Sequence, residues 1–349
     1  MFDIPNNSSS NHGSRGSTIF YSLFATGVGL SLQGMWLWNG GGEAFSQRPA
    51  NVKLTLEKIP FDGQKAYDQL VEICQLGPRI AGADGMRKQQ DYLQAHFAGL
   101  GGKVTLQEFE VRHPQHGAAV RLANLIVEWQ PEKKERILLC THYDTRPFAD
   151  RDANAKLRVK EGAFLGANDG ASGTALLCEL GRHMKNLKCP YGVDFVFFDG
   201  EELIYNDSTD EYFLGSSHFA KQYAAAPPPH RYKWGVLFDM IGDANLEIYR
   251  EVNSMNWRDT RPLVNEIWKT ANSLGVREFI PQTFHEVRDD HLPLHNDAHI
   301  PTIDIIDFDY VGRNRESHWH TTQDTPEHCS ALSLAKVGWV TLEWLKRVK

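Results

Sequence analysis

The stretch VDFVFFDGEE (193–202) joins an apolar run to a group of acidic residues. Its first part has the length and composition of a buried strand. The run ends at Asp199, and after one glycine come two adjacent glutamates, Glu201 and Glu202. Two carboxylates this close repel each other and raise each other's pKa. A bound dication would reverse that repulsion, so this strand end predicts a metal site.

Strand and helix patterns alternate on both sides of this stretch. Apolar residues recur at helical spacing in segments 66–77, 86–102, 170–187, 212–226, 259–275 and 333–348. Strand patterns occupy segments 103–111, 124–129, 136–144, 193–199, 234–243 and 301–307. The strands at 124–129 and 136–144 are separated by a charged turn and are expected to form a pair. This alternation predicts an α/β fold with a mixed, mostly parallel, twisted sheet between layers of helices.

Three of the predicted strands end in acidic or imidazole residues. They are LLCTHYD (138–144), VFFDGEE (196–202) and VLFDMIGD (236–243). Sheets of this class bind ligands beyond the C-terminal ends of their parallel strands. We therefore expect the three strand ends to meet in one functional site.

Four further residues are candidate ligands, although each has an ordinary explanation when taken alone. His142 belongs to an H-x-D turn, Asp169 could cap a helix, Asp239 could be a loop acid, and His320 has a neighbouring histidine. With the glutamate pair they supply imidazole and carboxylate donors and no thiolate. This donor set is typical of catalytic zinc. A second zinc would require a carboxylate that bridges two ions.

The composition argues against two other classes of protein. The net charge is −7 and no long basic run occurs, which argues against a nucleic-acid-binding protein. The five cysteines are scattered without CxxC spacing, which argues against a disulfide scaffold and against a thiolate zinc site. Small buried thiols are the favoured interpretation, with one disulfide left open.

The N-terminal segment differs in kind from the rest of the chain. Residues 1–17 are polar and low in complexity, and we expect them to be disordered. Residues 18–38 carry no charge, and small residues continue to 44, which predicts a signal peptide or a signal-anchor helix over 18–44. In either case the body, from residue 52 to 349, would be exported to the periplasm or the cell exterior. Membrane contact is expected only through 18–38, if that segment is retained.

The motifs HYD, GANDGASG, FFDGEE, DMIG and WHTTQDTPE, in this order, resemble the M28 zinc aminopeptidase fold. The resemblance covers most of residues 60–349 and implies a three-layer α/β/α catalytic domain. It implies that Asp169 bridges two metals and that Glu201 is the general base. The full ligand set that it implies is His142, Asp169, Glu202, Asp239 and His320.

Three other segments resemble the glutaminyl-peptide cyclotransferases (glutaminyl cyclases), bacterial ones included, within the same superfamily. They are HYDTRPFADRD, LIYNDSTDEYF and DDHLPL. That branch generally uses one zinc, whose ligands match Asp169, Glu202 and His320. His142 and Asp239 would then lie beside the metal site. A mechanistic aspartate of this branch matches Asp290, which Asp239 would hydrogen-bond.

The same resemblance implies the lining of a substrate pocket. Trp319 matches an aromatic residue of that pocket in the cyclases. A pocket tryptophan of the animal enzymes has no counterpart here, and Tyr205 or Tyr212 is expected to take its place.

The expected function is zinc-dependent conversion of an N-terminal glutamine of peptides or proteins to pyroglutamate, with release of ammonia. The alternative is a two-zinc aminopeptidase, in which Glu201 would take a proton from the attacking water. A third interpretation, an inactive partner-binding ectodomain, is disfavoured because no metal ligand is missing. One zinc is expected for the cyclase and two for the peptidase.

Overall fold

The computed structural model describes residues 54–310 and 317–349. They belong to one compact unit, Pro49–Lys349. The segments 1–17 and 18–44, for which we predicted disorder and a signal or anchor, lie outside the described residues. None of the described helices has the length and apolar character that a membrane crossing requires. The five cysteines are buried and free, which confirms the prediction of buried thiols.

Long helices form where the sequence carries apolar residues at helical spacing. They are α1 (Gly63–Gln75), α2 (Asp84–Leu100), α3 (Ala171–Met184), α4 (Leu214–Ala225), α6 (Arg261–Leu274) and α8 (Ala331–Arg347). Four short elements were not predicted because they span too few residues to show a period. They are the helices α5 (Val252–Asn256) and α7 (His291–Asn296) and the 3-10 turns η1 (Leu56–Lys58) and η2 (Pro326–His328).

The described strands form a six-stranded sheet of order β1-β2-β4-β3-β5-β8 and a separate two-stranded sheet. The large sheet contains β1 (Lys103–Arg112), β2 (Ala119–Trp129), β3 (Glu135–His142), β4 (Gly192–Phe198), β5 (Arg231–Asp239) and β8 (Thr302–Ile306). The small sheet, β6 (Ile248–Arg250) and β7 (Phe279–Thr283), was not predicted. The strands β4, β3, β5 and β8 pair with one another in parallel. β2 pairs antiparallel with both β1 and β4. The predicted mixed, mostly parallel sheet is confirmed.

The strands β2 and β3 are not paired, contrary to our expectation. β4 lies between them, antiparallel to β2 with Val127 opposite Phe195, and parallel to β3 with Leu139 opposite Phe195. The short charged turn therefore joins two strands that are not neighbours. The cause is the apolar composition of β4, which is buried along its whole length and needs a strand on each side.

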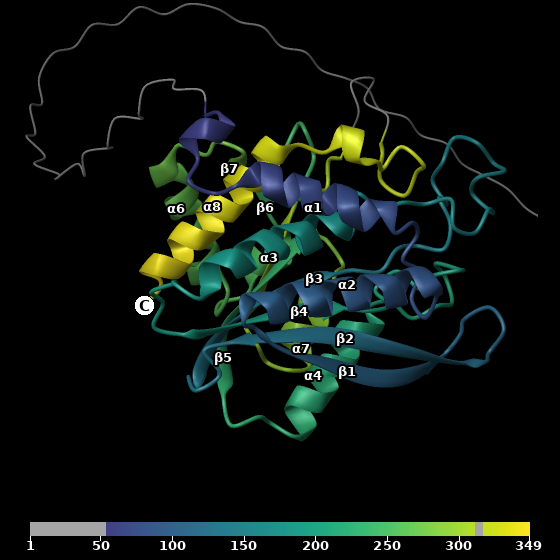
Figure 1. Ribbon diagram of the computed structural model, residues 1–349, viewed down its shortest axis with the longest axis horizontal. Coiled ribbons are helices and arrows are strands. Elements are labelled where there is room, and N and C mark those ends of the chain that lie inside the picture. The colour runs from purple at the N-terminus through teal and green to yellow at the C-terminus, as the bar shows by residue number, and fades with distance from the viewer. Residues whose placement is uncertain (1–53, 311–316) are drawn as a thin grey trace, which may run out of the picture. The chain divides into compact units, whose positions relative to one another are not determined.

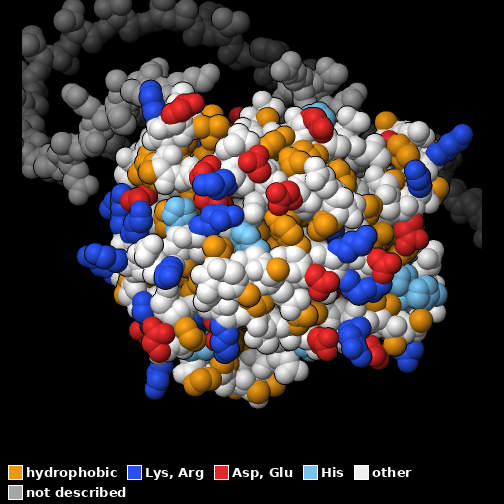
Figure 2. Space-filling view, in the orientation of Figure 1, with side chains coloured by type: hydrophobic (Ala, Val, Ile, Leu, Met, Phe, Trp, Pro, Cys, Tyr) orange, Lys and Arg blue, Asp and Glu red, His pale blue; other side chains and the backbone are white. Residues whose placement is uncertain are grey.

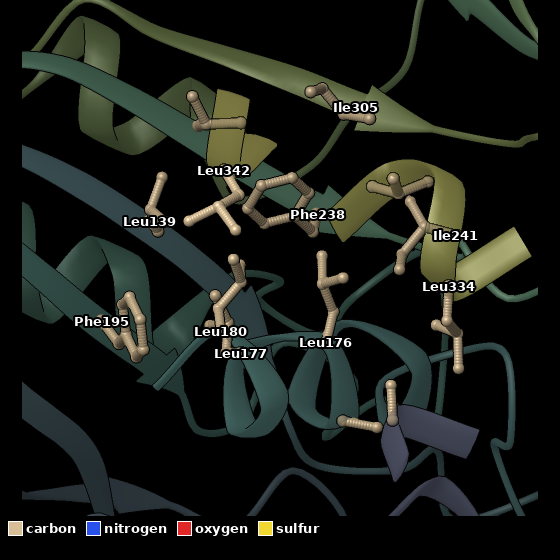
Figure 3. Packing of buried hydrophobic residues seen from close by; sticks show 14 of the residues in the cluster. Leu139, Leu176, Leu177, Leu180, Phe195, Phe238, Ile241, Ile305, Leu334 and Leu342 are labelled. Atoms are coloured by element: carbon tan, nitrogen blue, oxygen red, sulfur yellow. The ribbon is translucent and has the colours of Figure 1, made fainter. Parts of the chain in front are cut away.

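Helices cover both faces of the sheet, giving the three layers that the resemblance implied (Figure 1). Alternate residues of β3 divide between the faces. Leu139 belongs to the core that contains residues of α1, α2, α3 and α8, and Leu138 to the core that contains residues of α4 and α7. Figure 3 shows the first of these cores, where strand side chains meet side chains of α3 and α8. The strand residues are Leu139, Phe195, Phe238 and Ile305, and the helix residues are Leu176, Leu177, Leu180, Leu334 and Leu342.

The order of the strands creates a crevice at one edge of the sheet. From β3 the chain passes through α3 to β4 on one side, and then through α4 on the opposite face to β5 on the other side. The strand order therefore reverses at β3, where one connection leads to β4 and the next leads back across to β5. The two connections lie on opposite faces there and leave room for a ligand beyond the C-terminal strand ends. On the face in Figure 2, acidic and basic side chains are interspersed around exposed apolar ones.

Candidate metal centre

Five buried side chains converge beyond the C-terminal ends of the central strands. His142 is the last residue of β3 and Asp239 the last of β5, while Glu202 lies in the turn after β4. Asp169 precedes α3, and His320 comes from the loop between β8 and α8. Each of the five is exposed by 9% or less. The prediction that separate strand ends meet in one site is confirmed.

One group of ligands consists of Asp169, Glu202 and His320. Their ligand atoms lie within 4.8 Å of one another. His320 Nε2 is 2.9 Å from Glu202 Oε1 and 3.6 Å from Asp169 Oδ2. This is the set that the cyclase resemblance implied for a single zinc. We call it the Glu202 triad.

A second group consists of His142, Asp169 and Asp239, again with ligand atoms within 4.8 Å. His142 Nε2 is 3.1 Å from Asp169 Oδ1 and 3.2 Å from Asp239 Oδ1. We call it the His142 triad. Asp169 presents Oδ1 to this triad and Oδ2 to the other, as a bridging carboxylate does. The donors fit zinc, because buried carboxylates this close to each other require a compensating cation.

The adjacent glutamates have different environments. Burial raises the pKa of Glu201 well above its usual range, and the charge of Glu202 adds to this effect, although His142 opposes it. Burial would also raise the pKa of Glu202, but His320 and Arg146 outweigh it and the pKa is lowered. Glu201 is thus suited to exchanging a proton, and Glu202 to remaining an anionic ligand.

The backbone around the glutamate pair is held by Asp144. Its two carboxylate oxygens accept the N–H groups of Glu201 and Glu202 at 3.1 and 3.0 Å. The preceding Gly200 has a φ of 75°, and a Cβ there would lie 2.8 Å from a methyl group of Leu122. Glycine therefore permits the sharp turn that separates the two carboxylates.

Arg146 connects the Glu202 triad to two further acidic residues. Its backbone N–H donates to Glu202 Oε2 at 2.9 Å. Its guanidinium group pairs with Asp150 at 2.9 Å and with Asp207 of the segment after β4. Asp150 Oδ1 also lies 3.2 Å from Nδ1 of His320. A carboxylate behind a metal-binding histidine orients the ring and increases its basicity.

Asp324 fixes the loop that carries Asp169. It accepts the backbone N–H groups of Asn168 at 2.7 Å and Asp169 at 3.1 Å, and the Tyr310 hydroxyl donates to it at 3.1 Å. Backbone strain also gathers at the site, since Met240, directly after Asp239, and His320 have positive φ values of 46° and 56°. Such residues persist only where the surrounding structure holds them in place.

A pocket of about 300 Å³ opens over the Glu202 triad. Trp319 and Tyr212, two of the residues expected in a substrate pocket, line it. Tyr205 does not: its hydroxyl donates to Glu161 at 3.0 Å and its ring packs edge-on against Phe148. Of the two tyrosines proposed to replace the missing tryptophan, only Tyr212 faces the pocket.

The structure favours Asp289, rather than Asp290, as the aspartate that faces the site. Asp289 lines the pocket, and burial together with the charge of Asp239 raises its pKa well above the usual range. Asp290 does not line the pocket, and its Oδ1 accepts a hydrogen bond from Ser216 at 2.5 Å. The hydrogen bond predicted from Asp239 to Asp290 is replaced by this contact with Ser216.

Sequence reasoning did not assign roles to Arg146, Asp150, Asp289 and Asp324. The sequence did point to Arg146 and Asp150, because they lie in the segment HYDTRPFADRD that carried the cyclase resemblance. Asp324 lies within WHTTQDTPE, and Asp289 is adjacent to the aspartate that was chosen. The residue types were visible, but the site residues that Arg146, Asp150 and Asp324 contact lie far away in the sequence. They are Glu202, His320 and Asp169.

Comparison with known proteins gives a consistent assignment. Peptidase family M28 matches residues 124–345. The glutaminyl-peptide cyclotransferase of Bothrops jararaca is 24% identical, over 72% of each chain. Among solved structures, Fimbriiglobus ruber glutaminyl cyclase is 40% identical with a TM-score of 0.77, covering 86% of this chain and 100% of its own. A Zn-dependent exopeptidase from Parabacteroides distasonis is 29% identical with a TM-score of 0.75, covering 82% and 98%. The chain is an enzyme of peptidase family M28.

Proposed function

We propose that this enzyme is a zinc-dependent glutaminyl-peptide cyclotransferase. It would convert the N-terminal glutamine of a peptide or protein to pyroglutamate. The observation that carries the proposal is the pocket in which Glu201, with its raised pKa, lies beside the Glu202 triad and Asp289. The 40% identity to a glutaminyl cyclase over that protein's full length supports the same reaction.

Asp169, Glu202 and His320 would hold the zinc. A zinc ion bound there supplies Lewis acidity that polarises the γ-carboxamide of the substrate. Asp150 and Arg146 keep His320 and Glu202 oriented for this role through the contacts described above.

Glu201 moves the protons of the reaction. It takes a proton from the α-ammonium group and frees the amine, whose nitrogen attacks the γ-carbon of the same residue. As the new C–N bond forms and the bond to the amide nitrogen breaks, Glu201 gives this proton to the departing nitrogen, which leaves as ammonia. The ring nitrogen then loses its second proton to Glu201, which releases it to the solvent. A carboxyl group with a raised pKa suits both directions of transfer.

The remaining pocket residues bind and orient the substrate. Asp239 and Asp289 form an acidic end for the ammonium group and the amide nitrogen. Trp319 packs with Phe308 in an apolar wall, which suits the methylene groups of glutamine and excludes water. Because nucleophile and electrophile belong to one residue, holding its side chain in a folded conformation supplies much of the acceleration.

A two-zinc aminopeptidase remains the second candidate. The complete His142 triad and the 29% identity to a Zn-dependent exopeptidase favour it. Here Glu201 would accept a proton from the water that attacks the first peptide bond.

Incubation of the purified protein with Gln-Ala-amide and Leu-Ala-amide, followed by mass spectrometry, separates the two functions. The cyclase converts the first peptide to a product lighter by one ammonia and leaves the second intact. Release of free leucine with no cyclised product would contradict the cyclase proposal.

Replacement of the proton carrier, Glu201→Gln, gives a more specific test. We expect the zinc content to be retained and kcat to fall by about 10²–10⁴-fold, the usual contribution of a general acid–base group. Metal analysis and ammonia release measured on the same sample check both parts. Near-normal turnover would exclude Glu201 as the proton carrier.

We also propose that the catalytic domain, residues 52–349, acts outside the cytoplasm. The uncharged segment 18–38 and the small residues that follow support export. Cell fractionation with N-terminal sequencing of the mature protein tests this, and also distinguishes a cleaved signal peptide from a retained anchor. Recovery of the intact chain from the cytoplasm alone would contradict it.

A further inference from the structure

The mouth of the pocket differs in charge from its interior. The lining includes the carboxylates of the metal site at its deep end and two exposed arginines, Arg151 and Arg288, at its rim. The guanidinium carbon of Arg151 lies 4.0 Å from the centre of the Trp319 ring. That of Arg288 lies 5.6 Å from the centre of the Tyr212 ring. Each rim cation is thus held against an aromatic side chain that also lines the pocket.

The backbone brings both arginines to fixed places beside the site. The N–H of Arg151 donates to the carbonyl of the ligand His320 at 3.1 Å. Arg288 lies between two buried residues that line the pocket, Val287 and Asp289. Stacking on an aromatic face restricts a guanidinium group while leaving its N–H donors available to a ligand.

These rim cations have no anionic partner of their own within residues 54–310 and 317–349. Neither forms an ion pair there, whereas the buried Arg146 pairs with Glu202, Asp150 and Asp207. Two acidic side chains on the exposed rim line the pocket, Asp207 and Glu286. Asp207 already pairs with Arg146, so Glu286 is the acidic side chain that lowers the positive potential of the rim. With the Arg146–Asp207 pair set aside as neutral, the two arginines outnumber the one remaining glutamate and leave the rim cationic.

We infer that the enzyme prefers substrates with an acidic residue directly after the N-terminal glutamine, and that Arg151 and Arg288 determine this preference. The inference rests on the proposed function. Once the glutamine occupies the deep end of the pocket, the peptide continues outward past Trp319 and Tyr212. A carboxylate on its second side chain then meets the two guanidinium groups, whereas a lysine there is repelled.

The effect is expected to be moderate, since both arginines are exposed to water. Exposed ion pairs contribute little, so we expect kcat/KM for a second-position glutamate to exceed that for a lysine by ~3-fold or more at low salt. The preference should weaken as ionic strength rises, because salt screens exposed charges.

The test compares Gln-Glu-Ala-amide with Gln-Lys-Ala-amide on the zinc-loaded full chain. The amide removes the terminal carboxylate, so the two peptides differ only in the second side chain. The measured quantity is the ratio of the two kcat/KM values, which cancels any loss common to both substrates. The variants are Arg151→Gln, Arg288→Gln and the double variant. Arg121→Gln is the control, because Arg121 is exposed on β2 and does not line the pocket.

We expect a ratio above one that falls toward one in the double variant, rises in Glu286→Gln and is unchanged in Arg121→Gln. A ratio near one in the unmodified enzyme, with both peptides cyclised, would overturn the inference and leave the proposed function standing. A ratio that stays high in the double variant would overturn the role of the two arginines. Failure of the zinc-loaded enzyme to cyclise either peptide would overturn the proposed function, and this inference with it.

Discussion

The Glu202 triad and the His142 triad share Asp169 but are supported differently. In the Glu202 triad, the carboxylate of Glu202 accepts the Arg146 N–H, and Asp150 lies 3.2 Å from the far nitrogen of His320. In the His142 triad, the carboxylate nearest to Nδ1 of His142 is Asp144 at 3.7 Å, too far for a hydrogen bond. Both oxygens of Asp144 already accept the N–H groups of the glutamate pair.

This difference bears on how many metal ions the enzyme holds. Side chains behind the ligands contribute to metal affinity by fixing ring orientation and ligand charge. In the Glu202 triad, Asp150 lies behind the histidine and the Arg146 N–H donates to the glutamate. We therefore expect this triad to bind zinc more tightly than the His142 triad. A complete second triad with weaker support fits an enzyme that works with one zinc and retains the residues of a two-zinc relative.

The largest effect should follow Asp169→Asn, since this residue belongs to both triads. The amide keeps the size of the side chain but removes the charge that either metal would need. We expect zinc content near background and a loss of activity beyond the ~10–100-fold typical of residues behind the ligands. Circular dichroism should show an intact fold, and full zinc occupancy would contradict the role of Asp169.

The next largest effect should distinguish the triads directly. His320→Ala is expected to lose the zinc, because it removes a ligand of the tighter site. His142→Ala should retain the zinc if one ion is used, with a smaller loss of activity. Metal analysis of both variants after the same dialysis is the measurement. Equal partial loss in the two variants would favour a two-zinc enzyme and sharpen the case for the aminopeptidase.

The smallest effect concerns the carboxylate behind His320. Asp150→Asn should lower zinc affinity by about 10-fold, because a neutral amide orients the His320 imidazole less firmly and increases its basicity less than a carboxylate does. Asp207→Asn is the matched control, since Asp207 also pairs with Arg146 but its side chain is 55% exposed. Competition with a zinc-binding dye compares the two. Equal effects would mean that Asp150 acts through Arg146 alone.

Much of the fold and of the metal centre could be predicted from the sequence. The buried strand before the glutamate pair and the imidazole and acidic residues that end β3 and β5 are local patterns, so His142, the glutamate pair and Asp239 were found as candidates from position. The family resemblance then assigned Glu202 rather than Glu201 as the ligand. Strand pairing was not predictable in the same way, because the apolar β2, β3 and β4 are compatible with several orders. The position of β4 between β2 and β3 depends on how the whole sheet packs against the helices on both faces.

The sequence by itself determined the donor types and the strand ends that carry them, because both are properties of short segments. Tertiary structure decided which of two similar neighbours faces the pocket. Asp289 rather than Asp290, and Tyr212 rather than Tyr205, are turned toward the site. The physical reason is that Ser216 and Glu161, distant in sequence, hydrogen-bond the two residues that turn away. Long-range contacts of this kind leave no trace in a local pattern.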